Sequence, residues 1–157
     1  MAVALMKKTL DLLLKKIESL KAEVRENSIN LQKAADFGDL KENAEYKTAR
    51  EHQEYLFGKL RRFEQYLDHK VIDVNDLNPD TVTFGSSITI INNKTGKTVK
   101  YNILGPVEYE LESMENVVTY TSPLARQLIG RKKGEEVEVQ LPNRVDSIKI
   151  LEIEKII

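Results

Sequence analysis

Apolar residues recur at alternating spacings of three and four along the first part of the chain. The members of this stripe are Leu10, Leu13, Ile17, Leu20, Val24, Leu31 and Ala34, and Asn27 breaks it. This is the spacing of the buried a and d positions of a heptad, and neither Gly nor Pro interrupts the segment from Lys7 to Ala35. The pattern predicts a single helix of about 30 residues, roughly 45 Å long.

A second stripe with spacings of four and three follows. Its members are Ala49, Gln53, Leu56, Leu60, Phe63 and Leu67. Between the stripes stands the nonapeptide Gly-Asp-Leu-Lys-Glu-Asn-Ala-Glu-Tyr, residues 38–46. Two helices joined by so few residues must run antiparallel, and each then covers the apolar seam of the other. We therefore predict an antiparallel helical hairpin with its tip near residues 38–46.

The pattern changes to period two and to β-branched residues beyond about Val71. Residues 73–80 are rich in turn formers, as in a linker. The strands predicted after them cover residues 82–92, 98–104, 117–120, 136–141 and 147–156. Ser122 before Pro123 is the N-cap and first-turn signature of a short helix extending to Ile129, before Gly130. The expected fold is α+β, with four or five antiparallel strands and one short helix on a face.

These patterns divide the chain into a coiled-coil domain at residues 1–75, a linker at 76–81 and a β domain at 82–157. A charged fraction of 31% and an aromatic fraction of 6% suit a large solvated helical part. The formal net charge of −1 argues against non-specific attraction to nucleic acid. No apolar run approaches the roughly 20 residues that a membrane span needs, and the start lacks a signal-peptide pattern. We expect a cytoplasmic monomer without a membrane partner.

Asp39 and Glu42 are the candidate chemical groups of the tip. Asp-x-x-Glu at a helix start is a capping arrangement, which needs no further function. The same spacing places both carboxylates on one helical face, where they can hold one hard cation or its bound water. Two carboxylates are too few for a tight Mg²⁺ site, so a metal there would need further ligands from a partner. Spacing alone leaves both interpretations open.

Other catalytic signals are weak. The sequence has no Gly-rich phosphate loop, no Ser/His/Asp set and no cysteine. His52 and His69 are expected on the solvated side of the second helix. A mildly basic stretch after the tip is either a solvated face or a contact to RNA phosphate. Its members are Lys47, Arg50, Lys59, Arg61 and Arg62.

The nonapeptide, followed by Ala49-Arg50-Glu51, resembles the tip of the bacterial GreA/GreB transcript cleavage factors. The resemblance covers nearly the whole chain in order. It continues at residues 71–74, 84–86, 121–126, 128–130 and 134–139. It implies an N-terminal antiparallel coiled coil and a C-terminal domain of FKBP-like fold. The limited basic surface is more similar to GreA than to GreB.

The resemblance also implies a function. In the family, the coiled coil enters the secondary channel of a backtracked RNA polymerase, and the tip acids help hold a second Mg²⁺ and the attacking water in the polymerase's active centre. The 3′ segment of the RNA is then cleaved, so the factor is an accessory protein that shares Mg²⁺ and binds no cofactor alone. By this resemblance, Asp39 and Glu42 are the tip acids, and Asn43 and Tyr46 support the tip. Arg50 and Lys47 are expected to contact the RNA. Residues Thr121, Ser122 and Pro123 are expected to dock on the polymerase.

One alternative keeps the fold and inverts the effect. Some relatives plug the polymerase channel and inhibit the enzyme. Such relatives depart from the Asp-Leu-x-Glu-Asn core of the tip. This chain retains that core at residues 39–43.

Two alternatives belong to other functional classes. A prolyl isomerase would need an aromatic-lined pocket, whereas the C-terminal half has no Trp. Its large aromatic residues are Phe84, Tyr101, Tyr109 and Tyr120. A coiled-coil chaperone would need an apolar tip, and this one is polar. The polar tip residues include Asp39, Lys41, Glu42 and Glu45.

Overall fold

The computed structural model describes residues 3–36 and 44–156. The chain divides into two compact units. One unit is Asp11–Asp68, and the other combines Met1–Leu10 with His69–Ile157. The first unit is a helical hairpin and the second is built around a five-stranded sheet.

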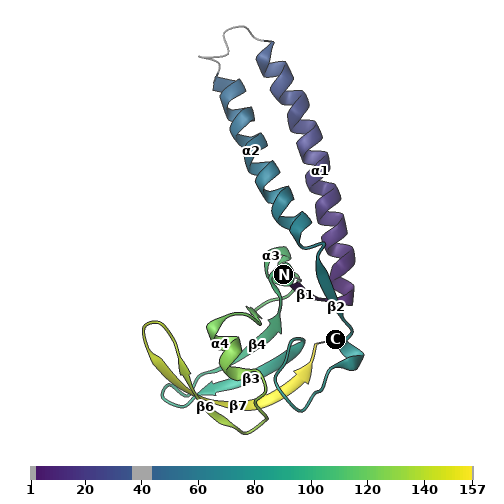
Figure 1. Ribbon diagram of the computed structural model, residues 1–157. Helices are drawn as coiled ribbons and strands as arrows, with labels where there is room; N and C mark the ends of the chain where they lie inside the picture. The colour runs from purple at the N-terminus through teal and green to yellow at the C-terminus, as the bar shows by residue number, and fades with distance from the viewer. Residues whose placement is uncertain (1–2, 37–43, 157) are drawn as a thin grey trace. The chain divides into compact units, whose positions relative to one another are not determined.

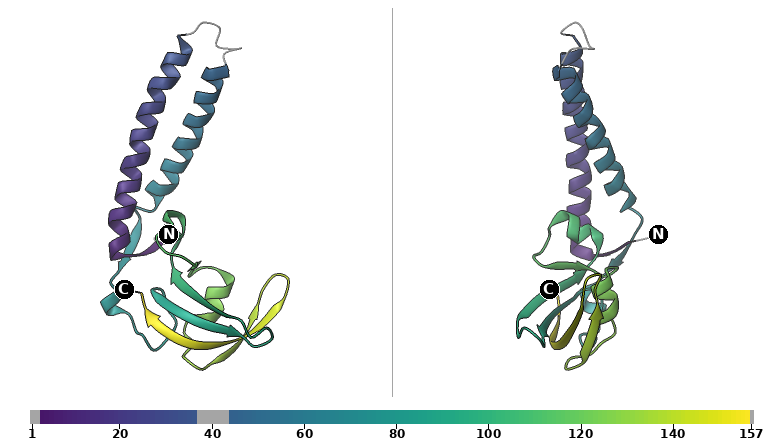
Figure 2. Two further views of the ribbon diagram at one scale, coloured as in Figure 1. Left: turned by 180° about the vertical axis from the view of Figure 1, so that it is seen from behind. Right: turned by 90° about the vertical axis from the view of Figure 1, so that its left-hand side faces the viewer.

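The hairpin consists of α1 (Lys7–Ala35) and α2 (Ala44–Gln65). The two helices lie side by side and run in opposite directions, as both Figure 1 and Figure 2 show. The predicted limits of the first helix are thereby confirmed. Large apolar members of both stripes are buried: Leu13, Ile17, Leu20, Leu56 and Phe63. Burial of each side chain of this size stabilises the fold by roughly 1.5–3 kcal/mol, which holds the pair together.

The sheet contains five strands in the order β5-β4-β3-β7-β6. Their bounds are β3 Ser86–Asn92, β4 Thr98–Leu104, β5 Val117–Thr119, β6 Glu136–Gln140 and β7 Val145–Lys155. Helix α4 (Pro123–Leu128) packs on one face of this sheet. The predicted N-cap is confirmed, because the Oγ atom of Ser122 accepts a hydrogen bond from the amide of Ala125 at 3.2 Å.

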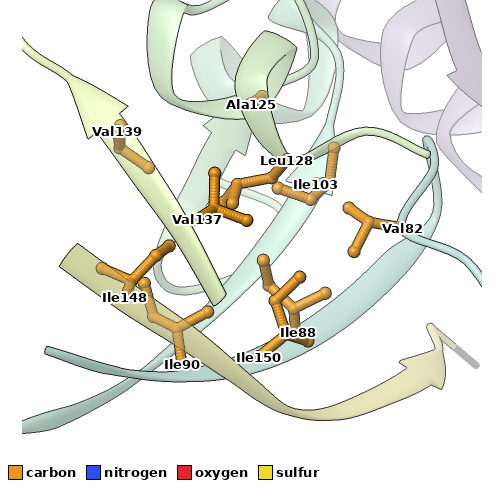
Figure 3. Packing of buried hydrophobic residues seen from close by; sticks show 10 residues of the cluster. All are labelled: Val82, Ile88, Ile90, Ile103, Ala125, Leu128, Val137, Val139, Ile148 and Ile150. Atoms are coloured by element: carbon orange, nitrogen blue, oxygen red, sulfur yellow. The ribbon is translucent and has the colours of Figure 1, made fainter. Parts of the chain in front are cut away.

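A β-branched core fills the space between the sheet and α4 (Figure 3). Inward side chains alternate along the strands, as Ile88 and Ile90 do on β3. Between Thr89 and Ile90 the pairing of β3 with β7 shifts by one residue, which is a β-bulge. The bulge falls at Leu151, so β7 points Ile150 and then Ile153 toward the core. One extra residue of this kind resets the alternation without losing the apolar face.

Three details of the predicted β half are wrong. β5 pairs with β4 in parallel, whereas antiparallel pairing was expected. A second helix, α3 (Pro106–Leu111), lies between β4 and β5. Pro106 at its first turn carried the same signal as Pro123. The strand expected from Val82 begins only at Ser86, because Gly85 turns the chain with a φ of 89°.

The two compact units divide the chain differently from the expected boundary at residue 75. Residues Val3–Met6 form β1, which pairs in parallel with β2 (His69–Ile72). Met6 is buried in a second apolar cluster with Phe84, Leu104 and Ile156. The start of the chain therefore belongs to the sheet unit, since its apolar residues are covered there. The expected linker at 76–81 lies inside the same unit, where Thr81 bridges to Lys132.

Gly105 allows β1 to approach. A Cβ atom at this position would overlap the carbonyl oxygen of Ala4. The amide of Ala4 in turn donates to the hydroxyl of Tyr120 at 3.3 Å. This close contact requires a residue without a side chain at the turn into α3.

Across residues 3–36 and 44–156, no helix is both long and apolar enough to cross a bilayer. The longest, α1, carries charged residues throughout its exposed face. This distribution is that of a helix with one covered side and one solvated side.

Glu108 is a buried carboxyl group in the sheet unit. Its side chain is 0% exposed, and its Oε1 atom accepts a hydrogen bond from the amide of Gly105 at 3.4 Å. Its Oε2 atom has no hydrogen-bond partner among the described residues. Burial raises the pKa of this carboxyl from 4.5 to about 7, against the opposing effect of nearby groups of Gly105, Met6 and Thr9. Desolvation of the charged form is the dominant cause.

This raised pKa predicts a pH-dependent stability. The folded protein binds the Glu108 proton more tightly than the unfolded chain, so the resulting stabilisation is present at acidic pH. It is lost as the pH rises from 4.5 to about 7, on the order of 3 kcal/mol in the free energy of unfolding. Glu108→Gln removes the titration, and we expect its stability relative to wild type to rise over that pH range.

The measurement is urea unfolding at several pH values, followed through methyl NMR signals of Ile88 and Ile150. The exposed Glu115→Gln serves as the control and is expected to track wild type. Parallel pH profiles for wild type and Glu108→Gln would contradict the raised pKa.

Candidate functional site

The residues predicted at the tip fall into two groups. Asp39, Glu42 and Asn43 lie outside the described residues. Tyr46 and Lys47 are described on the first turn of α2, where Tyr46 is half-buried and Lys47 is exposed. The roles predicted for these five residues remain predictions.

Arg50 lies one turn further along α2 and is exposed. Its Nε atom is 3.9 Å from the Oε1 atom of Glu54, and the two side chains are 66% and 72% exposed. An ion pair this exposed contributes little to stability and opens at small cost. The guanidinium is therefore accessible to a ligand such as a phosphate group.

A polar layer interrupts the apolar seam between α1 and α2. Asn27 and Gln53 are only 7% and 9% exposed. The Nδ2 atom of Asn27 donates to Oε1 of Gln53 at 2.8 Å and to the carbonyl oxygen of Ala49 at 2.9 Å. The Nε2 atom of Gln53 donates to the hydroxyl of Ser28 at 2.8 Å, which donates to the carbonyl oxygen of Val24 at 2.9 Å. We call Asn27, Ser28 and Gln53 the polar layer.

In the sequence, Asn27 stands out only as a break in the first stripe. Gln53 stood in the second stripe without being recognised as its partner. The signal that could have found the pair is the presence of one buried-position amide in each stripe, because two amides that face each other satisfy their own hydrogen bonds.

A hollow of about 430 Å³ lies on the hairpin beside the polar layer. It is lined by Asn27, Asn30, Ala44, Glu45, Thr48, Ala49 and His52. His52 stacks on Tyr55 with ring centroids 6.2 Å apart. The hollow offers polar groups near the start of α2, but Glu45 is the one carboxyl group among its described lining residues.

Within the described residues, no group of three or more His, Cys, Asp or Glu side chains is placed to hold a metal ion. The carboxylates that sequence analysis assigned to Mg²⁺ are outside this part of the chain. Their oxygen donors are of the type that Mg²⁺ prefers, and their number requires ligands from elsewhere.

The residues predicted to dock a partner lie at the start of α4. Thr121 and Pro123 are exposed, and Ser122 is half-buried because its hydroxyl caps the helix. The next residue, Leu124, lines a cleft of about 540 Å³ in the sheet unit. The predicted docking residues directly precede Leu124 in the chain, and the cleft itself had no signal in the sequence.

The cleft lining combines apolar and basic residues, and we call the apolar set its floor and the basic set its rim. The floor consists of Ile90, Val99, Tyr101, Leu124, Val139, Leu141 and Ile148. Lys94, Lys97 and Arg144 contribute positive charge, and Asp146 is the one acidic residue among the described residues of the lining. Asp146 is engaged by Arg144, whose Nε atom lies 3.0 and 3.1 Å from its two carboxylate oxygens. The two lysines leave the rim with a net positive charge.

This lining bears on the isomerase alternative. Of the described residues around the cleft, Tyr101 alone is aromatic. A pocket that binds proline through aromatic walls has a different composition. The cleft fits better as a surface for an apolar side chain flanked by acidic groups.

Two sequence families together match nearly the whole chain. The family described as "Transcription elongation factor, N-terminal" matches residues 3–72. The family described as "Transcription elongation factor, GreA/GreB, C-term" matches residues 77–155. The transcription elongation factor GreA of Nitrosococcus oceani is 38% identical over 146 residues, which cover 91% of each chain. That of Syntrophus aciditrophicus is 37% identical over 141 residues, which cover 88% of this chain and 86% of the relative.

Solved structures of similar proteins are more distant in sequence. GreA factor homolog 1 of Thermus thermophilus is 15% identical, with a TM-score of 0.46 and coverage of 98% of this chain and 99% of that one. A prokaryotic transcription elongation factor GreA/GreB from Nitrosomonas europaea is 16% identical, with a TM-score of 0.41 and 98% coverage of both chains. The sequence matches are decisive by themselves. The chain belongs to the GreA/GreB family of transcription elongation factors.

Proposed function

We propose that this protein enters the secondary channel of RNA polymerase with its hairpin and stimulates cleavage of backtracked RNA. The observation that carries the proposal is the retained Gly-Asp-Leu-Lys-Glu-Asn-Ala-Glu-Tyr segment between two long antiparallel helices. With 29 residues, α1 has a length of roughly 44 Å, which suits a narrow and deep access channel. Acidic groups at the end of such a rod are suited to completing the active site of another protein.

Asp39 and Glu42 are the residues that would hold a Mg²⁺ ion shared with the polymerase. When bound, that ion activates water and stabilises the charge that develops on the phosphodiester. The polymerase supplies the remaining ligands and carries out the reaction. The protein is thus an accessory factor, and its two carboxylates need not bind Mg²⁺ outside the complex.

Residues at the start of α2 would hold the RNA. Lys47 and Arg50 are exposed on one side of the described end of this helix. Their charges suit contacts to phosphate oxygens, which fix the position of a strand without reading its sequence. Asn43 and Tyr46 are proposed to support the tip beside the acids.

The sheet unit would hold the factor on the polymerase. Thr121, Ser122 and Pro123 directly precede Leu124 of the cleft lining, so we assign the three residues and the cleft to one docking surface. The apolar floor and the rim charge of Lys94 and Lys97 suit a polymerase segment with an apolar anchor and acidic neighbours. Docking through one unit and chemistry through the other would allow binding and cleavage to be separated by mutation.

The first test is RNA cleavage in a purified backtracked elongation complex with Asp39→Ala or Glu42→Ala. We expect the cleavage rate to fall by about a hundredfold or more, because each acid stabilises the shared ion in the transition state. The dissociation constant for the polymerase should stay within about threefold of wild type, because the substitutions leave the contacts that bind the factor to the polymerase unchanged.

Asp36→Ala is the matched control, since it removes a neighbouring exposed acid that has no assigned role. If the acids act only as helix caps, the variants will unfold at a markedly lower temperature and lose activity in proportion. If wild type slows elongation and releases no RNA fragments, the factor is an inhibitor of the same fold.

A second test addresses docking. Lys94→Glu combined with Lys97→Glu reverses the charge of the cleft rim, and we expect the dissociation constant for the polymerase to rise by about tenfold or more. The loss should shrink as salt is added, because exposed charges are screened. At saturating factor, the cleavage rate should match wild type.

The control reverses two exposed lysines outside the cleft lining, Lys70→Glu with Lys132→Glu. An equal loss of affinity in this control would assign the effect to overall charge. Unchanged affinity in the rim variant would remove the cleft from the docking surface.

A further inference from the structure

The polar layer costs stability where an apolar seam would be simpler. Burying amide groups in place of Leu gains nothing from the hydrophobic effect, and replacing buried polar groups with apolar ones is often neutral or stabilising. Buried Asn residues in coiled coils are best known for specifying register. We propose that the polar layer fixes the register of α1 against α2, so that Asn27 and Gln53 are positioning residues for the tip acids. The proposal rests on the function proposed above.

The hydrogen bonds of the layer close in only one register. Both Nδ2 hydrogens of Asn27 are used, and both ends of the Gln53 amide are used. The hydroxyl of Ser28 links this hydrogen-bond network to the backbone of α1, because it donates to the carbonyl oxygen of Val24. If α2 slid by one turn, Asn27 would face Ala49 or Leu56. Neither of these side chains can form a hydrogen bond with the amide of Asn27.

The seam between the layer and the tip offers little other resistance to sliding. Leu31 and Ala49 are half-buried there, and Ala34 is buried but small. The large buried side chains Leu13, Ile17, Leu20, Leu56 and Phe63 all lie on the other side of the layer. Small side chains interlock weakly, so apolar packing near the tip leaves the register poorly specified.

The layer is also close to the part of the molecule that needs the register. Asn27 stands eight residues before the end of α1 at Ala35, about 12 Å along the axis. Gln53 stands nine residues after the start of α2 at Ala44. A slip of one turn moves one described helix end by about 5.4 Å relative to the other. Carboxylates that must meet the strict geometry of Mg²⁺ cannot tolerate such a shift.

The test is the double variant Asn27→Leu with Gln53→Leu in the full chain. We expect it to unfold at the same or a higher temperature than wild type while its cleavage rate falls by about tenfold to a hundredfold. Its half-saturating concentration for the polymerase should stay within about twofold, since docking uses the other unit. A merely structural role would lower stability and activity together.

Register is measured directly in the free protein. The chain has no cysteine, so Gln32→Cys and Glu51→Cys, both at exposed positions, accept spin labels selectively. We expect one narrow distance distribution in the wild-type background and a broadened or shifted one in the double Leu variant. Leu56→Met, which changes a fully buried seam residue without touching the amides, should keep the narrow distribution and the cleavage rate.

The exchange of the two amides, Asn27→Gln with Gln53→Asn, should recover part of the cleavage rate and part of the narrow distance distribution that the double Leu variant loses. The proposal is overturned if the double Leu variant keeps the wild-type distance and rate, or if its rate and unfolding temperature fall together. If wild type itself does not stimulate cleavage, the proposed function and the positioning role both fall. The distance measurement then still decides whether the layer sets the register.

Discussion

Neither helix of the hairpin can bury its apolar stripe alone, and the rest of the molecule depends on this constraint. The stripes cover each other only if the helices run antiparallel, which places the connecting segment at the far end of the hairpin. We propose that the acids of the connecting segment act inside a partner, which would supply the further ligands that two carboxylates need to hold Mg²⁺.

The same apolar seam must both stabilise the helix pair and fix its register. Apolar packing is non-directional, so a heptad stripe tolerates sliding by whole turns more readily than a hydrogen-bonded layer does. Asn27 and Gln53 replace packing energy with directional bonds at one level of the hairpin. The large buried side chains lie on one side of that level and the small ones on the other. Stability and register are thereby assigned to different parts of the helix pair.

The sheet unit solves a different problem. Its core needs only alternating β-branched residues, a bulge that resets the alternation at Leu151, and α4 as a cover. The first strand of the chain joins it because Gly105 leaves room for the carbonyl of Ala4. Glu108 is buried in the same unit, where desolvation raises its pKa to about 7. The cleft beside α4 shares Ile90, Val139 and Ile148 with this core, and its lining also carries Lys94, Lys97 and Arg144.

Elements with local signals could be predicted without the structure. The heptad spacing set α1 from Lys7 to Ala35, and Ser122 with Pro123 set the start of α4, because helix period and capping involve residues within a few positions of one another. The role of the acids Asp39 and Glu42 was predicted from a contiguous motif and stays a prediction. The folded molecule was needed to reveal the pairing of β1 with β2, the parallel β5, the burial of Glu108 and the hydrogen bond between Asn27 and Gln53. Each of these joins segments distant in the chain, and no spacing within one segment records which distant group will cover it.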